Sequence, residues 1–156
     1  MTTAIREIRT QEDMNQLWGG VVAKFEGLKW ATWLADETDR LEKRHAQTME
    51  KQTDPTGRKH PPLAASTINR KGHSRILFDT NRLYNSLVSP SAEFSIRYAI
   101  DEWPRAQLIY GTSAPYSPFL TTGTDRMPAR PHVGITRQRF GFIAHRACVY
   151  ALEQLI

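Results

Sequence analysis

The stretch MPARPHVGITRQRF, residues 127–140, separates the two kinds of structure that the sequence predicts. Pro128 and Pro131 fix their own φ angles and bias the residue before each of them away from helical geometry. Thr136 then offers a side chain that can cap a helix. We therefore expect a stiff, extended connector between a sheet and a C-terminal helix. Arg130, on this rigid backbone, is suited to bind a carboxylate or the carbonyl groups of a neighbouring segment, or to lie at the surface beside a turn.

The run after the connector, RQRFGFIAHRACVYALEQLI, is typical of an amphipathic helix, predicted over residues 136–156. Cys148 lies on or near its apolar face without a partnering motif, so it is predicted to be a small core residue rather than a nucleophile. The stripe that we expect to be buried consists of Phe140, Ile143, Ala147, Ala151 and Leu155.

Residues 76–135 are predicted to form a small antiparallel sheet of about three to four strands. In the segment 95–101, apolar residues alternate with Arg97 and Ala99, which is the period-two pattern of a strand. The segment 106–112 ends on a glycine turn, and 86–91 is predicted to be a further strand of the same meander. Thr80 is a candidate cap for a short helix at residues 83–86.

Residues 1–52 are predicted to be helical from residue 11 onward, with a break near Gly27. The first helix has apolar residues at three- or four-residue steps, namely Met14, Leu17, Val21 and Phe25. The stripe of the second helix consists of Trp30, Trp33, Leu34, Leu41, His45 and Met49. The two tryptophans are predicted to be core or subunit-contact residues.

Residues 53–75 are predicted to form a long basic loop with at most one helical turn, at residues 64–69. Between Lys51 and Arg75 six basic residues stand against one acidic residue, while the other 15 basic and 15 acidic residues balance. The segment 51–75 therefore carries the whole net charge of +5, and it can meet phosphate, an acidic protein surface or only water. The residues that we expect to contact a neighbouring subunit or another partner are Arg58, Lys59, Arg70, Lys71, Arg75 and Arg130.

The order of helices, loop, strands and helix predicts an α+β fold in a single domain over residues 1–156. No apolar run approaches the roughly 20 residues that cross a bilayer, and the N-terminus lacks the apolar region of a signal peptide. One cysteine cannot form an internal disulfide, so a reducing cytoplasm is the expected compartment.

The sequence lacks the motifs that usually carry catalysis. It contains no GxSxG, Walker or GxGxxG motif, and its five histidines have no HExxH, CxxC or paired-carboxylate surroundings. We therefore expect no enzymatic activity and no bound metal or cofactor. His60 and His73 are predicted to be solvated within the basic loop.

Four segments, DPTGRKHPPLAASTINRKG, ILFDTNRLYNSL, IYGTSAPYSPFLTTGT and MPARPHVGI, occur in a distinctive order. Together they resemble the virion morphogenesis and tail-completion proteins of tailed phages and prophages, the Mu-like neck family. The resemblance covers residues 54–136, roughly half of the chain. The matching positions are Asp54, Pro55, Gly57, Leu63, Thr67, Ile76, Leu77, Leu83, Ser86, Gly111, Thr112, Tyr116, Gly123, Pro128, Arg130, Pro131 and Gly134.

The chain departs from the family pattern at four positions. His60 stands where a tryptophan is common, Ser117 where an alanine is common, and His132 where an aromatic or apolar residue is common. Asn81 replaces the usual glycine, and the turn there is expected to survive because asparagine tolerates left-handed backbone geometry.

The resemblance implies a structural role in the virion. Members of this group form rings, often sixfold, at the head–tail junction or the head-proximal end of the tail tube, where they complete the tail and join it to a DNA-filled capsid. It thus implies a ring homo-oligomer, a hexamer in the sixfold case, with tail-tube or connector proteins as partners and DNA passing through its lumen. The implied location is the neck or tail of the virion, and the host cytoplasm during assembly, without a membrane.

Two other functions remain open from the sequence. A nucleic-acid-binding module would use the basic segment 58–75 and would bind DNA in a strongly salt-dependent way. The segment has no interleaved aromatic residues, which argues against single-strand binding. A small hydrolase is the third hypothesis, for which no residue can be nominated.

Overall fold

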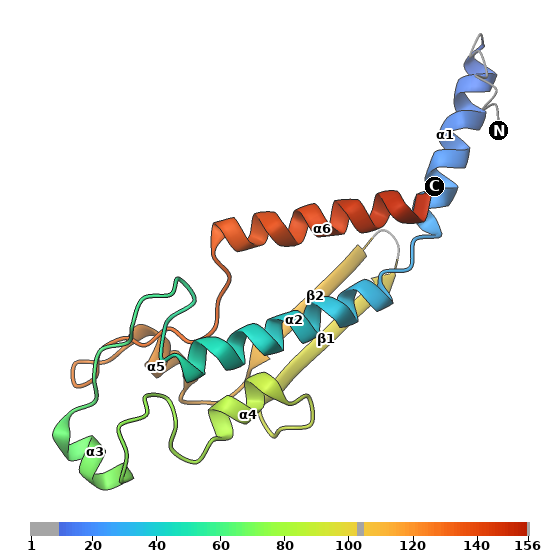
Figure 1. Cartoon of the computed structure of the whole chain (residues 1–156). Coiled ribbons are helices and arrows are strands. Elements are labelled where there is room, and N and C mark those ends of the chain that lie inside the picture. The colour runs from blue at the N-terminus through green and yellow to red at the C-terminus, as the bar shows by residue number, and fades with distance from the viewer. Residues whose placement is uncertain (1–9, 103–104, 156) are drawn as a thin grey trace.

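The computed structural model describes residues 10–102 and 105–155 and has an α+β fold, as predicted (Figure 1). Within these ranges it consists of six helices and one two-stranded antiparallel sheet. In chain order the elements are α1 (Gln11–Glu26), α2 (Ala31–Glu50), α3 (Ala65–Lys71), α4 (Arg82–Val88), β1 (Ser95–Glu102), β2 (Arg105–Thr112), α5 (Ser117–Thr122) and α6 (Arg137–Leu155).

The predicted break near Gly27 is confirmed, because α1 ends at Glu26 and α2 begins at Ala31. α1 extends away from the other elements, at the far end of the molecule from α3 and α5 (Figure 1). The predicted stripe of α2 is buried at Leu34, Leu41, His45 and Met49 and half-buried at Trp30 and Trp33. In α1 the side chains of Leu17, Val21 and Phe25 lie outside the described set.

The sheet has two strands rather than the predicted three to four. β1 and β2 form a hairpin in which Ser95 lies opposite Thr112 and Glu102 lies opposite Arg105. The segment predicted as a further strand, 86–91, instead contains the end of α4 and a turn. Leu83 and Leu87, four residues apart, are both buried, so a helix places them on one face against the core. α4 begins after Asn81, at φ 60°, and has no side-chain cap, so the prediction of a Thr80 cap is wrong.

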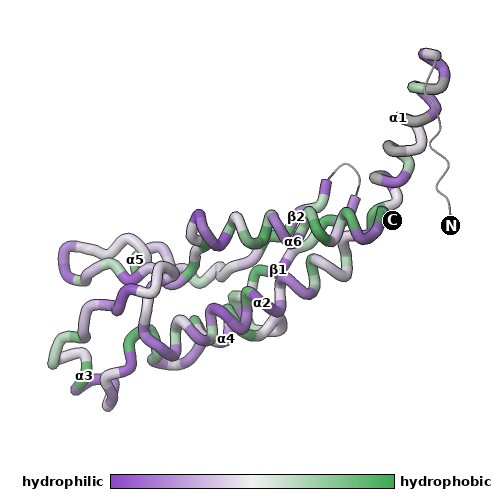
Figure 2. Tube along the Cα trace, turned by 45° about the horizontal axis from the view of Figure 1, so that its top comes forward, coloured by the Kyte–Doolittle hydropathy of each residue, from purple (hydrophilic) through white to green (hydrophobic). Residues whose placement is uncertain are grey.

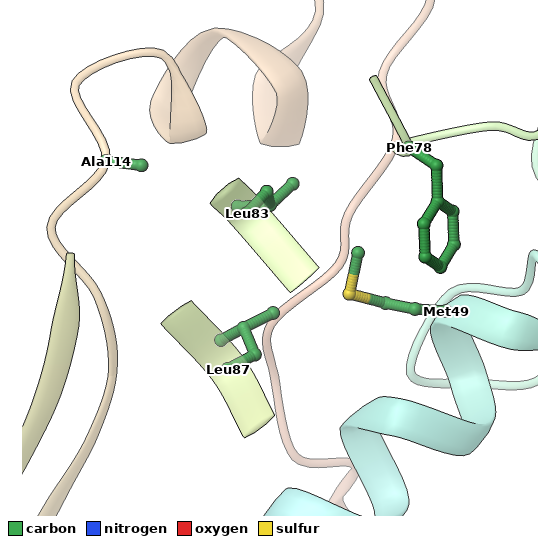
Figure 3. Packing of buried hydrophobic residues seen from close by; sticks show 5 residues of the cluster. All are labelled: Met49, Phe78, Leu83, Leu87 and Ala114. Atoms are coloured by element: carbon green, nitrogen blue, oxygen red, sulfur yellow. The ribbon is translucent and has the colours of Figure 1, made fainter. Parts of the chain in front are cut away.

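α2 and α4 pack against the hairpin and form the helical layer of the fold. The main core lies where α2, α4 and the segments before α4 and after β2 meet (Figure 3). Tyr110 and Phe94 pack against it from the hairpin side, and Leu120 and Val133 from the C-terminal half. Its buried members are Met49, Phe78, Leu83, Leu87 and Ala114.

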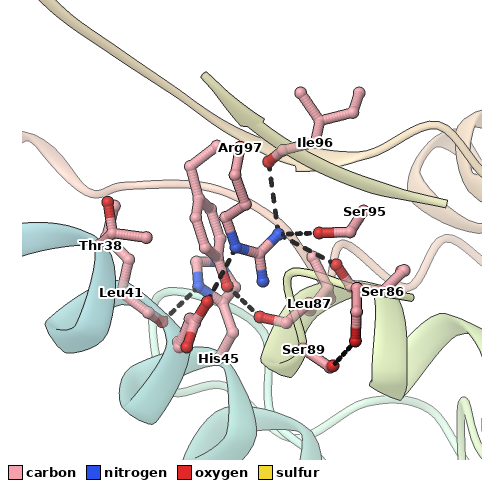
Figure 4. A network of polar contacts seen from close by, with 12 residues as sticks. Thr38, Leu41, His45, Ser86, Leu87, Ser89, Ser95, Ile96 and Arg97 are labelled. Carbon is pink, nitrogen blue, oxygen red and sulfur yellow. Dashed lines mark hydrogen bonds and ion pairs between the residues drawn. The ribbon is translucent and has the colours of Figure 1, made fainter. Parts of the chain in front are cut away.

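A polar network joins the hairpin to both helices of this layer (Figure 4). From β1, Arg97 donates to the Glu42 carboxylate of α2 at 2.8 Å and to the Ser86 carbonyl of α4 at 3.1 Å. Its guanidinium also lies over the ring of Tyr110, 4.4 Å from the centroid. Tyr110 in turn stacks on His45 of α2 at 5.0 Å. Arg97 Nη2 has no hydrogen-bond partner among the described residues, whereas its other guanidinium nitrogens hold the hairpin against α2 and α4.

α6 lies alongside α2 in the opposite direction and is held mainly by polar contacts. Arg146 forms an ion pair with the buried Glu37, and the Tyr150 hydroxyl donates to the Lys29 carbonyl at 2.6 Å. The predicted Thr136 cap is confirmed, since the Arg139 N–H donates to the Thr136 hydroxyl at 3.2 Å.

The predicted buried stripe of α6 is wrong, because no residue of α6 is buried. Phe140 is largely exposed and the other four stripe residues are half-buried. Cys148, predicted as a core residue, is exposed. Arg146 and Tyr150, which contact α2 and the residues before it, lie three residues after Ile143 and Ala147 and therefore share the inward side of the helix with part of the predicted stripe.

The segment 53–75 is more structured than the long loop predicted from its composition. The Asp54 carboxylate accepts hydrogen bonds from the N–H groups of Thr56 and Arg58 at 2.8 and 2.9 Å, which closes a tight turn. Gly57 has φ 90° in this turn, a geometry that favours glycine. α3 then occupies Ala65–Lys71, about two turns rather than one. Among the described residues, no helix is long and apolar enough to cross a membrane.

Candidate functional site

A pocket of about 770 Å³ is lined by residues of α3 and its surroundings, and α3 lies at the end of the molecule opposite α1 (Figure 1). Three chain segments form its walls: residues 62–71 with α3, residues 77–83 before and within α4, and residues 116–130 from α5 to the connector. The size lies within the range of about 300–1,000 Å³ that is usual for binding sites.

The floor and walls of the pocket are mainly apolar. They include Leu63, Leu77, Leu83, Leu120 and Met127. Leu77 has φ 64°, a left-handed geometry that costs a branched residue about 1 kcal/mol or more. Backbone strain of this kind is concentrated at functional sites, and here it fixes an apolar side chain at the pocket wall.

Arg130 joins two walls of the pocket. Its side chain is 5% exposed and donates three hydrogen bonds, at 3.1–3.3 Å, to the carbonyl groups of Pro61 and Pro62. Its own N–H donates to the Leu120 carbonyl at 2.7 Å. Burial lowers the pKa of Arg130, but a guanidinium stays protonated in proteins. The expectation that Arg130 binds carbonyl groups of a neighbouring segment is thereby confirmed.

Gly123 is required at the turn between α5 and the connector. Its φ is 78°, and a Cβ added there would lie 2.7 Å from the Ala129 nitrogen. The backbone of Gly123 therefore packs directly against the connector, and the isolated pairing of Thr124 with Met127 closes the turn. This close approach positions Met127 and Arg130 at the pocket.

The pocket has a strongly basic lining. Asp79 is the single carboxylate among its lining residues, against five cationic side chains: Arg70, Lys71, Arg82, Arg126 and Arg130. Lys71 donates to the Arg75 carbonyl at 2.8 Å, and Arg82 pairs with Glu93 at the surface. Burial lowers the pKa of Lys71, and Asp79 opposes this effect. Arg70 and Arg126 have no ion pair within the described part of the chain and remain exposed.

The structure separates the basic residues predicted as contacts into two groups. Arg70, Lys71 and Arg130 line the pocket, whereas Arg58, Lys59 and Arg75 do not. Arg58 and Lys59 are exposed on the Asp54 turn. Arg75 is exposed and stacks on Phe78, 3.8 Å from the ring centroid. The sequence missed Arg82 and Arg126, because only folding brings these distant positions to α3.

Two histidines are buried close to Arg130. The prediction that His60 is solvated is wrong, because its side chain is buried where the family pattern has a tryptophan. His132 donates from Nδ1 to the Arg130 carbonyl at 3.2 Å, so its Nε2 accepts from the Ser117 hydroxyl at 2.9 Å. Burial lowers the pKa of both histidines, which favours their neutral forms. His73 is half-buried.

The pocket contains neither a nucleophile paired with a base nor a set of metal ligands. Among the described residues, no group of three or more histidine, cysteine or carboxylate side chains could hold a metal ion. The arrangement of apolar walls under a basic rim suits the binding of a molecule with an apolar part and negative charge.

Comparison of the chain with protein-family models, with curated proteins and with solved structures finds no match. Function is therefore inferred from the pocket, from the exposed helical faces and from the order of the sequence motifs.

Proposed function

We propose that the chain is a structural virion protein of a tailed phage or prophage. It forms a ring at the head–tail junction or the head-proximal end of the tail, completes the tail and joins it to the capsid. The proposal combines the order of the four motifs with the surface of the fold, which has large apolar areas left uncovered.

The observation that carries the proposal is the outer face of α6. Phe142, Val149 and Leu152 follow one another at steps of seven and three residues and therefore share one face of the helix. Phe142 is 53% exposed and Leu152 is 60% exposed. Figure 2 shows hydrophobic residues along α6, at the outside of the fold. Contiguous exposed apolar side chains of this kind mark an interaction surface.

The hairpin offers a second uncovered apolar area. Tyr98 and Ile109 lie directly opposite each other in the register of β1 and β2, and both are largely exposed. A subunit of a ring needs two different surfaces, because each copy contacts one neighbour on either side. The faces of α6 and of the hairpin supply such surfaces.

Native mass spectrometry and negative-stain electron microscopy of the purified chain test the proposal. We expect a closed oligomer of defined size, and we expect the double variant Phe142→Ser/Leu152→Ser to lose it while the circular dichroism spectrum stays the same. The control is Gln154→Ser, an exposed polar position on the same helix, which should assemble normally. A strict monomer at tens of micromolar, even with its tail-tube or connector partner present, would overturn the proposal.

A second candidate function is nucleic-acid binding. It is favoured by one observation, the exposure of Arg58, Lys59, Arg70 and Arg75. Solvent-facing basic side chains in one segment are suited to contact phosphates without reading the base sequence.

A further inference from the structure

We propose that the basic pocket binds helix α1 of a neighbouring copy, with Met14, Trp18 and Val22 against its apolar walls. This contact rests on the proposed ring, in which it would join one copy to the next. That contact is distinct from the face of α6 that carries the proposal above.

α1 has an apolar stripe that is exposed in the described part of the chain. Met14, Trp18 and Val22 recur at steps of four, so they lie along one side of the helix. All three are exposed, and Trp18 is 59% exposed. α1 stands away from the rest of the fold (Figure 1). An isolated helix of 16 residues is marginal in water, so α1 needs a contact that covers this stripe.

The pocket has the features of a groove that accepts a helix. Recognition of an amphipathic helix uses apolar anchors at one-turn spacing in an apolar groove. The stripe from Met14 to Val22 spans about 12 Å at 1.5 Å per residue. The pocket of about 770 Å³ offers apolar walls from α3, from α4 and from the connector. Trp18 is the expected anchor, because tryptophan is enriched among the residues that dominate interfaces.

The charges of the two surfaces are complementary. The sequence of α1 contains Glu12, Asp13 and Glu26 against Lys24 as its one basic residue. The pocket presents five cationic side chains against Asp79 alone. Arg70 and Arg126 are exposed at its rim without an ion pair, so they are free to meet the carboxylates near the start of α1. Opposite charges on two surfaces favour their encounter and fix their orientation.

The positions of the two surfaces require separate copies. α1 and α3, whose residues line the pocket, lie at opposite ends of the molecule in both views (Figures 1 and 2). The helix therefore enters the pocket of a neighbour, whose own α1 is left for the next copy. Such a contact joins two different surfaces, and repeated around an axis it closes a ring.

Cross-linking of two chains, each with one added cysteine, tests the contact. In a Cys148→Ser background, one chain carries Asn15→Cys beside the α1 stripe and a tagged second chain carries Ala64→Cys at the pocket. Both native side chains are exposed, so the packing anchors stay intact. We expect mixed oligomers to form a 15–64 cross-link on oxidation. The matched control replaces Asn15→Cys by Lys43→Cys, which is exposed on α2 and should give no product.

Two variants supply an independent measurement. Trp18→Ser should raise the concentration needed for half-assembly by at least about tenfold, as expected for a buried anchor. Glu12→Arg and Arg126→Glu should each weaken assembly, and the double variant should recover part of the loss.

The possible results separate the contact from the ring itself. Rings that form without the 15–64 cross-link and that tolerate Trp18→Ser overturn the contact but leave the proposed function standing; a different virion protein or DNA in the pocket would give this result. A chain that stays monomeric and forms no cross-link overturns both.

Discussion

Arg130 shows how much a single side chain does in this fold. Within the described part of the chain it pairs with no carboxylate, and its guanidinium donates hydrogen bonds to the carbonyl groups of Pro61 and Pro62. Those two carbonyls belong to consecutive prolines, whose backbone has no N–H to contribute to the local structure. The planar guanidinium reaches both carbonyls at once and joins the connector to the segment before α3.

We predict that Arg130→Lys lowers the free energy of unfolding by about 2 kcal/mol, because an ammonium group cannot reproduce the three hydrogen bonds of the guanidinium. Urea denaturation of the monomer below its assembly concentration measures the change. Arg58→Lys is the control, since Arg58 is exposed on the Asp54 turn and should give almost no change. Equal stability of the two variants would show that Arg130 is not a structural joint.

Buried histidines make stability depend on pH. Burial lowers the pKa of His45, His60 and His132 below 6.5, and for His45 the charges of Arg44 and Arg97 act in the same direction. The folded state then binds fewer protons near pH 6 than the unfolded chain does. The stability from the neutral histidines is present above the unfolded pKa and is lost as the pH falls through it toward the folded pKa.

We therefore predict a free energy of unfolding that is level between about pH 7 and pH 8 and falls below about pH 6.5. Chemical denaturation at a series of pH values measures the curve, and His45→Gln should flatten it. His145→Gln is the control, because His145 is exposed on α6. A curve for His45→Gln that is as steep as that of the native chain would contradict the prediction.

The backbone geometry of a single residue could be predicted from the sequence, but the hydrogen bond between two residues distant in the chain could not. The left-handed geometry of Asn81 was expected from its place in the family pattern and is present at φ 60°. Ser117 and His132 both depart from that pattern, and only the structure shows that they hydrogen-bond to each other. The pairing depends on the turn of the chain between them, which a sequence of one protein does not reveal.

At the scale of elements, α2 obtains its N-terminal cap from a distant strand. Trp30, at the cap position, provides no side-chain hydrogen bond. The Asp101 carboxylate at the end of β1 instead accepts from the N–H groups of Trp30 and Ala31, at 3.0 and 2.9 Å. A carboxylate there also interacts favourably with the positive end of the helix.

We predict that Asp101→Ala lowers the free energy of unfolding by about 1 kcal/mol, the usual value for the loss of a capping side chain. Asp101→Asn should lose less, since one oxygen still accepts. Glu102→Ala is the control, because Glu102 is the exposed neighbour in the same strand. Thermal denaturation followed by circular dichroism measures the three variants, and identical midpoints would rule out the cap.

The elements that the sequence misassigned share a physical cause. The sequence predicts a short helix at 83–86 and a strand at 86–91, although one helix, α4, covers the first and the beginning of the second. The segment 86–91 is short and has no charged residue that would distinguish a helical from a strand pattern. For α6 the helix itself was predicted correctly, but its buried face was not. An apolar stripe predicts the face that needs covering, but in α6 the inward side also carries Arg146, which pairs with Glu37, and the stripe residues there stay only half-buried.

At the scale of the whole molecule, the basic residues of one segment have different surroundings. Arg70 lines the pocket, while Lys59 lies outside it on the Asp54 turn. The net charge of the segment could be predicted from the sequence, but the pocket could not. Its walls come from three segments separated along the chain, and nothing local indicates that they meet.

We predict that Arg70→Glu weakens assembly while Lys59→Glu does not, because only Arg70 lines the pocket that we propose to bind a neighbouring α1. Native mass spectrometry measures assembly of both variants. Duplex-DNA affinity at two salt concentrations provides the comparison, since a DNA-binding site would give a log–log slope of about −0.9 per phosphate contacted. If both variants reduced this slope and neither affected assembly, nucleic-acid binding would be the better interpretation.

The long-range contacts also determine when the chain can fold. Asp101 caps a helix 71 residues before it, Arg130 binds a carbonyl 69 residues away, and Arg146 pairs with Glu37 across 109 residues. Contacts so far apart in sequence raise the contact order and slow folding, because loop closure must precede them. During synthesis the N-terminal helices leave the ribosome before these partners exist. Truncated chains that end before residue 101 should therefore remain unfolded.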